Sequence, residues 1–129
     1  MSGLLLDTNA FAMVLTDDPR LPAEARTRLG SADRVALSVI SLYEIGQKVR
    51  LGKWPEIGPF APGLAEQARQ DGIELVSLTP GAALAASLLD WDHRDPFDRM
   101  VAVVARAEDL DLVSSDTAFD ALGLVRIWA

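Results

Sequence analysis

Leu4-Leu5-Leu6-Asp7-Thr8-Asn9 is the stretch that decides the predicted fold. Three consecutive apolar residues are typical of a short strand that is buried on both faces, as in a parallel sheet. The strand then stops at a carboxylate, and Asp, Thr and Asn all favour turns and helix caps. We therefore place Asp7 at the carboxyl end of a central strand, which is the edge where open α/β sheets bind ligands.

Four more apolar or β-branched segments predict strands, and helical patterns separate them. Strands that alternate with helices predict an α/β protein whose sheet is mainly parallel and carries helices on both faces. The predicted strands after the first are 34–40, 74–78, 110–114 and 124–128, and the predicted helices are 10–15, 22–29, 41–51, 64–71, 80–89 and 96–109.

Composition limits the class of protein. The chain has 129 residues, of which 50% are hydrophobic, and this predicts one folded domain over residues 1–129. No cysteine is present, so disulfides and thiolate metal sites are excluded. The apolar runs are too short to span a membrane and Asp7 interrupts the first of them, so we expect a cytoplasmic protein without a signal peptide. The net charge of −7 suits solubility, a basic partner or acids gathered around a cation.

Local signals predict how several helices begin and end. Ser41-Leu42-Tyr43-Glu44 matches a capping box, in which Ser41 caps the helix and Glu44 bonds back to it. Ile40 and Ile45 would add a hydrophobic staple to this helix start. Gly30 and Gly52 are predicted to end the helices that precede them.

Four acids fall at comparable places in the predicted fold. Asp7 and Asp116 end strands, whereas Glu44 and Asp98 lie in the first turns of helices. If the strands are parallel, all four side chains meet at one edge of the sheet. Asp95, one helical turn before Asp98, is a fifth candidate.

Each acid also has a purely structural interpretation. Glu44 is explained by the capping box, Asp95 by an N-cap or a pair with Arg99, and Asp98 by the helix dipole. Asp7 and Asp116 suit turns or caps equally well. The functional interpretation therefore depends on their joint position at one edge.

Several carboxylates held together repel one another unless a cation intervenes, and oxygen ligands suit Mg²⁺ or Mn²⁺. Such ions lower the pKa of bound water and neutralise phosphate charge. The single histidine excludes a multi-histidine zinc site, and we interpret His93 as an exposed loop residue. The sequence contains no G-x-S-x-G motif and no glycine-rich phosphate loop.

Taken together, these segments resemble a PIN-domain protein, specifically the VapC-type ribonuclease toxins of bacterial toxin–antitoxin pairs. The resemblance covers nearly the whole chain, and its pieces occur in the family's order. They are the first stretch quoted above, the segments 39–45 and 112–116, and the block His93-Arg94-Asp95-Pro96-Phe97-Asp98-Arg99-Met100.

The resemblance implies an α/β/α sandwich of three layers and RNA cleavage that depends on Mg²⁺ or Mn²⁺. Carried over by motif, the catalytic and metal-binding acids are Asp7, Glu44, Asp98 and Asp116. It also implies a homodimer and a cognate VapB-type antitoxin whose C-terminal segment blocks the site. Supporting roles in the site are expected for Asp95, Asn9, Ser115 and Arg99. Thr8 or Asn9 would hold Asp7 in position. The candidates for binding RNA phosphates are Lys48, Arg50 and Arg99.

Two other functions stay open on the sequence. A non-catalytic PIN-like module could bind protein or RNA through an acidic pocket without cutting. A haloacid-dehalogenase-like phosphatase would also begin with a strand followed by Asp7-Thr8, but it needs an acid where Asn9 stands. The leading hypothesis is a metal-dependent endoribonuclease.

Overall fold

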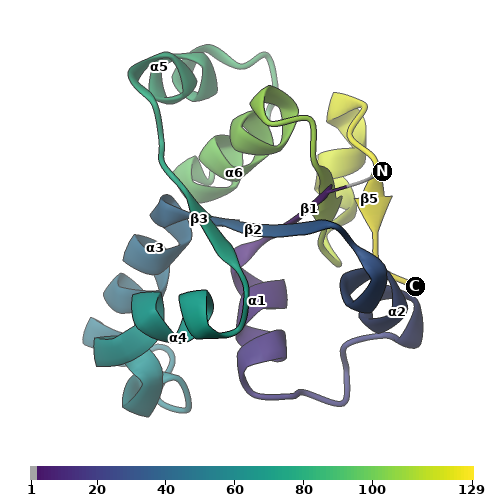
Figure 1. Ribbon diagram of the computed structural model, residues 1–129. Coiled ribbons are helices and arrows are strands. Elements are labelled where there is room, and N and C mark those ends of the chain that lie inside the picture. The colour runs from purple at the N-terminus through teal and green to yellow at the C-terminus, as the bar shows by residue number, and fades with distance from the viewer. Residues whose placement is uncertain (1–2) are drawn as a thin grey trace.

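The computed structural model describes residues 3–129 and shows a parallel sheet between two layers of helices (Figure 1). The strand order is β3-β2-β1-β4-β5, and every neighbouring pair is parallel. The predicted α/β class and the five-stranded sheet are therefore confirmed. The strands are β1 (Gly3–Leu6), β2 (Arg34–Ser38), β3 (Glu74–Val76), β4 (Asp111–Val113) and β5 (Arg126–Ile127).

Helices join the strands in the order that a parallel sheet requires. The α-helices are α1 (Thr8–Leu15), α2 (Ala23–Ser31), α3 (Val39–Arg50), α4 (Leu64–Gln70), α5 (Pro80–Leu88) and α6 (Pro96–Ala107), and two 3-10 helices are η1 (Gly58–Gly63) and η2 (Thr117–Leu122). No helix within residues 3–129 is both long and apolar enough to cross a membrane.

The central strand β1 supplies both halves of the core. Leu4 and Leu6 face one side, where they pack with α1 to α4, and Leu5 faces the other side with α6. This alternation is the two-residue period of a strand, and all three leucines are fully buried. Figure 1 shows the same division, with α1 to α4 below the sheet and α5 and α6 above it.

The order of the strands reverses at β1. The chain runs from β1 outward through β2 to β3, then returns to place β4 on the other side of β1. Such a reversal is a topological switch point, where the loops after two neighbouring strands part and leave a crevice. Asp7 follows β1, and Asp116 follows β4, so both lie at this point.

The predicted capping box at Ser41 is wrong. Helix α3 begins at Val39, and its N-cap is Ser38, whose hydroxyl accepts a hydrogen bond from the amide of Ile40 at 3.2 Å. The strand is correspondingly shorter than predicted, because Ser38 pairs with Val76 in the last register position of β2. Glu44 therefore lies beyond the first turn, and the capping explanation for it is removed.

The predicted helix ends are partly correct. Gly52, with φ of +74°, follows α3 as predicted, since an L side chain rarely adopts this conformation. Gly30, by contrast, lies inside α2 without a positive φ, so the prediction that it ends the helix is wrong. The helix continues to Ser31 before an extended residue ends it.

Candidate metal centre

Asp7 is a buried carboxylate at the end of β1. It caps α1, and its Oδ1 accepts a hydrogen bond from the amide of Ala10 at 2.7 Å. Burial raises its pKa to about 6, although hydrogen bonds from Ser114 and Ala10 oppose that rise. The negative charges of Asp98 and Glu44 raise the pKa of Asp7 further, so Asp7 interacts electrostatically with both acids across the switch point.

Glu44 is the second buried acid, and α3 carries it into the interior with only 4% of its surface exposed. Its Oε1 lies 2.6 Å from the Thr8 hydroxyl, and its Oε2 accepts from Lys48 Nζ at 2.8 Å. Thr8 Oγ1 also lies 2.9 Å from the Ser41 hydroxyl. Because a hydroxyl carries one hydrogen, Thr8 donates to the carboxylate, and Ser41 donates to Thr8.

Thr8 therefore contacts an acid other than the one expected. The sequence suggested that it steadies Asp7, whereas its hydroxyl joins α1 to Glu44 on α3. Asn9, the other candidate for that role, is exposed. The carboxylate of Asp7 is held by its hydrogen bond from the amide of Ala10, and the nearby Ser114 hydroxyl lowers its pKa.

Asp98 lies in the first turn of α6, as predicted. Asp95 is the N-cap of this helix and accepts from the amide of Phe97 at 2.9 Å. Asp98 Oδ2 lies 2.7 Å from His93 Nε2. Burial raises the pKa of Asp98, the bond with His93 opposes this, and the charges of Asp95 and Glu44 raise it further.

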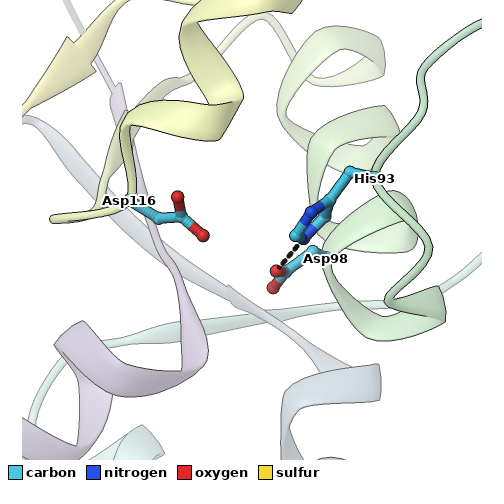
Figure 2. Close-up of side chains that lie close together, drawn as sticks. All are labelled: His93, Asp98 and Asp116. Atoms are coloured by element: carbon cyan, nitrogen blue, oxygen red, sulfur yellow. Dashed lines mark hydrogen bonds and ion pairs between the residues drawn. The ribbon is translucent and has the colours of Figure 1, made fainter.

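Asp116 is exposed and caps η2, where its Oδ1 accepts from the amide of Ala118 at 2.9 Å. Its own amide donates to the buried Ser114 hydroxyl at 3.0 Å. This turn holds the carboxylate toward Asp98 and His93, as Figure 2 shows. The neighbouring Ser115 is exposed and lines the adjacent cleft.

His93, Asp98 and Asp116 form one cluster. One ligand atom from each of them lies within 4.8 Å of the other two. Among residues 3–129, no other set of three His, Asp or Glu side chains meets as closely. The interpretation of His93 as an exposed loop residue missed this position, and the only sequence signal for it was its place in the same block as Asp98.

Two of the three basic residues chosen as RNA ligands, Lys48 and Arg99, have other partners in this structure. Lys48 pairs with Glu44 and lies 5.5 Å from the ring centre of Trp54. Arg99 donates to backbone carbonyls of the segment 86–93 and does not pair with Asp95. Arg50 is exposed.

A cleft of about 470 Å³ opens beside the acids. Asn9 on α1 and Ser115 after β4 line it near the site, and Arg20 and Trp54 line it farther away. A second hollow of about 300 Å³ shares Asn9 and Trp54 with the cleft and adds Lys48 and Lys53. The walls of both hollows carry charges of either sign, because Asp18 and Arg20 line the cleft, Lys48 and Lys53 line the second hollow, and Glu56 lines both.

The donor set fits a hard divalent cation. Asp7, Glu44, Asp98 and Asp116 are carboxylates, the oxygen ligands that such a cation prefers. Burial, with a smaller effect of neighbouring negative charge, raises the pKa of Asp7 and Asp98, and a bound cation would favour their charged forms. An ion bound there would lower the pKa of a bound water and neutralise phosphate charge. Asp98 links the two buried acids to the cluster with His93. Its charge interacts with those of Glu44 and Asp7, and its carboxylate contacts His93.

The sequence matches the PIN domain family over residues 4–124. The chain therefore belongs to the PIN domain family, and the family predicted from its motifs is confirmed. No curated protein sequence matches the chain significantly.

Solved structures of toxin–antitoxin proteins share the fold. VapBC2 from Rickettsia felis, bound to a promoter DNA fragment, is 19% identical with a TM-score of 0.70, over 98% of this chain and 99% of that one. VapC20 from Mycobacterium tuberculosis, described as a toxin that cleaves the sarcin–ricin loop, is 18% identical with a TM-score of 0.67, over 95% of this chain and 96% of that one. DNA-bound VapBC from Salmonella typhimurium is 20% identical with a TM-score of 0.66, over 98% and 96% of the two chains. At these identities the likeness establishes a common fold.

Proposed function

We propose that this chain is a divalent-metal-dependent endoribonuclease that acts as a VapC-type toxin. The proposal is supported by the cluster of Asp98 and Asp116 with His93, and by the position of Asp7 at the end of β1, where the charge of Asp98 raises its pKa. Carboxylates at the ends of β1 and β4 and in the first turn of α6 converge only because the strands are parallel. Membership of the PIN domain family supports a nuclease.

The four acids would have different roles in the reaction. Asp7 and Asp98 would hold the ion, and Glu44 and Asp116 would complete its surroundings or orient the attacking water. Mg²⁺ or Mn²⁺ suits such oxygens, and when bound it supplies an activated water and positive charge next to the scissile phosphate. The chain itself holds the carboxylates in place through caps and buried hydroxyl groups, which is the preorganisation that catalysis requires.

RNA would reach the site through the cleft between α1 and the segment around Trp54. Lys53 lines the second hollow and is suited to phosphate contacts, whereas Arg20 in the cleft is paired with Asp18. We assign the same cleft to the C-terminal segment of a VapB-type antitoxin, which would block the site in a complex of toxin homodimers. Structures with the same fold are VapBC complexes, and this supports that partner. The place of action would be the cytoplasm, where the RNA substrate is found.

Substitution of Asp7 tests the proposed reaction. Asn also caps helices, so Asp7→Asn keeps the cap on Ala10 and removes the charge. We expect purified, antitoxin-free protein to cleave RNA with Mg²⁺ or Mn²⁺, and the variant to lose cleavage while its circular dichroism is unchanged. Sequencing of the cleaved RNA ends measures both the activity and its target. Equal cleavage by a folded Asp7→Asn variant would refute the assignment.

One observation favours the non-catalytic module as a second candidate. Both oxygens of Glu44 already have partners, Thr8 and Lys48, so this acid is satisfied without a metal. Calorimetric titration with Mn²⁺ separates the two functions. Binding at micromolar to low-millimolar concentration supports the nuclease, and absence of binding supports the module.

A further inference from the structure

We propose that His93 supplies a nitrogen ligand to the metal centre, and that this ligand makes the centre favour Mn²⁺ over Mg²⁺. The inference rests on the proposed function, because it concerns the same ion. It goes beyond the acidic set by adding an imidazole and a preference between metals.

The His93 imidazole lies close enough to the carboxylates of Asp98 and Asp116 to share an ion with them. His93 Nε2 lies 2.7 Å from Asp98 Oδ2, and the nearest ligand atoms of His93, Asp98 and Asp116 all lie within 4.8 Å of one another. Ligands around one octahedral ion, with bonds of about 2.1–2.2 Å, are separated by roughly 3 Å when adjacent and just over 4 Å when opposite. Figure 2 shows the ring directed toward both carboxylates. The cluster therefore has the spread of ligands that share an ion.

The surrounding structure holds the ring in this place. Trp91 packs against the imidazole with ring centres 4.7 Å apart, and it also packs against the buried Phe119 of η2 at 5.6 Å. Phe119 lies in the helix that Asp116 caps, so one aromatic stack spans from the loop of His93 to the turn of Asp116. Both sides of the cluster are thus held by the same packed side chains.

Arg99 fixes the backbone that carries His93. Its guanidinium donates to the carbonyls of Trp91 at 2.8 Å and of His93 at 2.9 Å, and also to three carbonyls at the end of α5. A planar guanidinium that is bonded on several sides permits little movement of the loop. The imidazole is preorganised, as the supporting groups of metal-binding histidines commonly ensure.

The chemistry of the donor set gives the preference between metals. Mg²⁺ favours oxygen ligands and water, whereas imidazole nitrogen binds Mn²⁺ and later transition ions more readily. For Nε2 to bind the ion it must carry no hydrogen, so the neutral imidazole would carry its one hydrogen on Nδ1 and Asp98 would bind as the carboxylate. Removal of the imidazole should therefore weaken Mn²⁺ binding more than Mg²⁺ binding.

The composition of the chain makes the spectroscopic test unambiguous. His93 is the only histidine, so an imidazole nitrogen coupled to bound Mn²⁺ in tag-free protein can come from no other residue of the chain. Pulsed electron paramagnetic resonance of the Mn²⁺ complex should show this nitrogen coupling. Labelling the histidine with ¹⁵N should change the coupling pattern, and this measurement needs no mutation.

Substitution supplies the affinity test. We expect His93→Gln to weaken Mn²⁺ binding by about tenfold or more and to change Mg²⁺ affinity by less than about threefold, measured by calorimetry. Asp92→Asn is the matched control, since it removes an exposed charge beside His93 and lies outside the cluster. It should leave both affinities and the nitrogen coupling unchanged.

The outcomes separate this inference from the proposed function. Bound Mn²⁺ without nitrogen coupling overturns the ligand role of His93 and leaves the nuclease proposal standing. No Mn²⁺ binding at all overturns both. Nitrogen coupling in a protein that does not cleave RNA supports the ligand assignment and contradicts the nuclease.

Discussion

The two halves of the acidic centre are built differently. Asp7 and Glu44 are 7% and 4% exposed, and each accepts hydrogen bonds from neighbours in the interior. Asp98 and Asp116 lie on the open side, where His93 joins them. The buried half is fixed by the fold, whereas the side chains of the open half are more exposed to solvent. Asp98 connects the halves, because it contacts His93 and because the charge of Glu44 raises its pKa.

Asp98→Asn tests the open half and should have the largest effect. Removal of this carboxylate would take a proposed metal ligand from the site, and we expect RNA cleavage to fall by about a thousandfold, as when a main electrostatic group is lost from a catalytic site. At neutral pH the variant should be at least as stable as the original protein, because burial raises the pKa of Asp98 and its charge therefore disfavours the folded state. Cleavage rates and thermal unfolding measure the two effects.

Asp95→Asn is the matched control for Asp98→Asn. It makes the same chemical change at the start of the same helix, and Asn preserves the cap on Phe97. We expect less than about a threefold change in cleavage. A loss comparable to that of Asp98→Asn would show that Asp95 belongs to the site and does more than cap α6.

The buried half should instead appear in the pH dependence of stability. The pKa of Asp7 is about 6 in the folded protein, against 3.8 for an unperturbed group. The folded state thus binds this proton more tightly than the unfolded chain. The contribution of Asp7 is therefore fully present below pH 3.8 and is lost as the pH rises through about 6.

We expect the metal-free protein to lose up to about 3 kcal/mol of unfolding free energy between pH 4 and pH 7 through Asp7, since one pKa unit is worth 1.36 kcal/mol. Urea denaturation in the presence of a chelator measures this. Asp98 acts in the same direction, so the part due to Asp7 is the difference from Asp7→Asn, whose profile should be flatter. Parallel profiles for the two proteins would contradict the pKa assigned to Asp7.

Much of this division follows from local sequence, and the rest depends on distant contacts. Leu4 to Leu6 predicted a central strand that ends at Asp7, because a continuous apolar run suits a strand with helices on both faces. The position of Asp98 in the first turn of α6 followed from Asp95-Pro96, which is a strong local signal for a helix start. Family membership was also readable from the spacing of the motifs.

The errors occur where tertiary structure chooses between local options. Ser38 and Ser41 both suit an N-cap, and the end of the pairing between β2 and β3 selects Ser38. His93 lies among polar neighbours, which suggested an exposed loop. Its actual place depends on Arg99, whose carbonyl partners reach back into α5, and on the stack of Trp91 against Phe119. No local pattern encodes those contacts.

Of the substitutions expected to cause a loss, Thr8→Val has the smallest effect, and it tests how the buried half is held. Valine keeps the shape of threonine but leaves Glu44 Oε1 and the Ser41 hydroxyl without this partner in the interior. We expect a loss of about 1–3 kcal/mol in unfolding free energy, because a buried polar group loses its hydrogen bond. Thr8→Ser keeps the hydroxyl and should recover most of that loss in urea denaturation. If Thr8→Val is as stable as Thr8→Ser, the hydroxyl bridge does not fix Glu44, and the contrast between a fixed half and an open half fails at this residue.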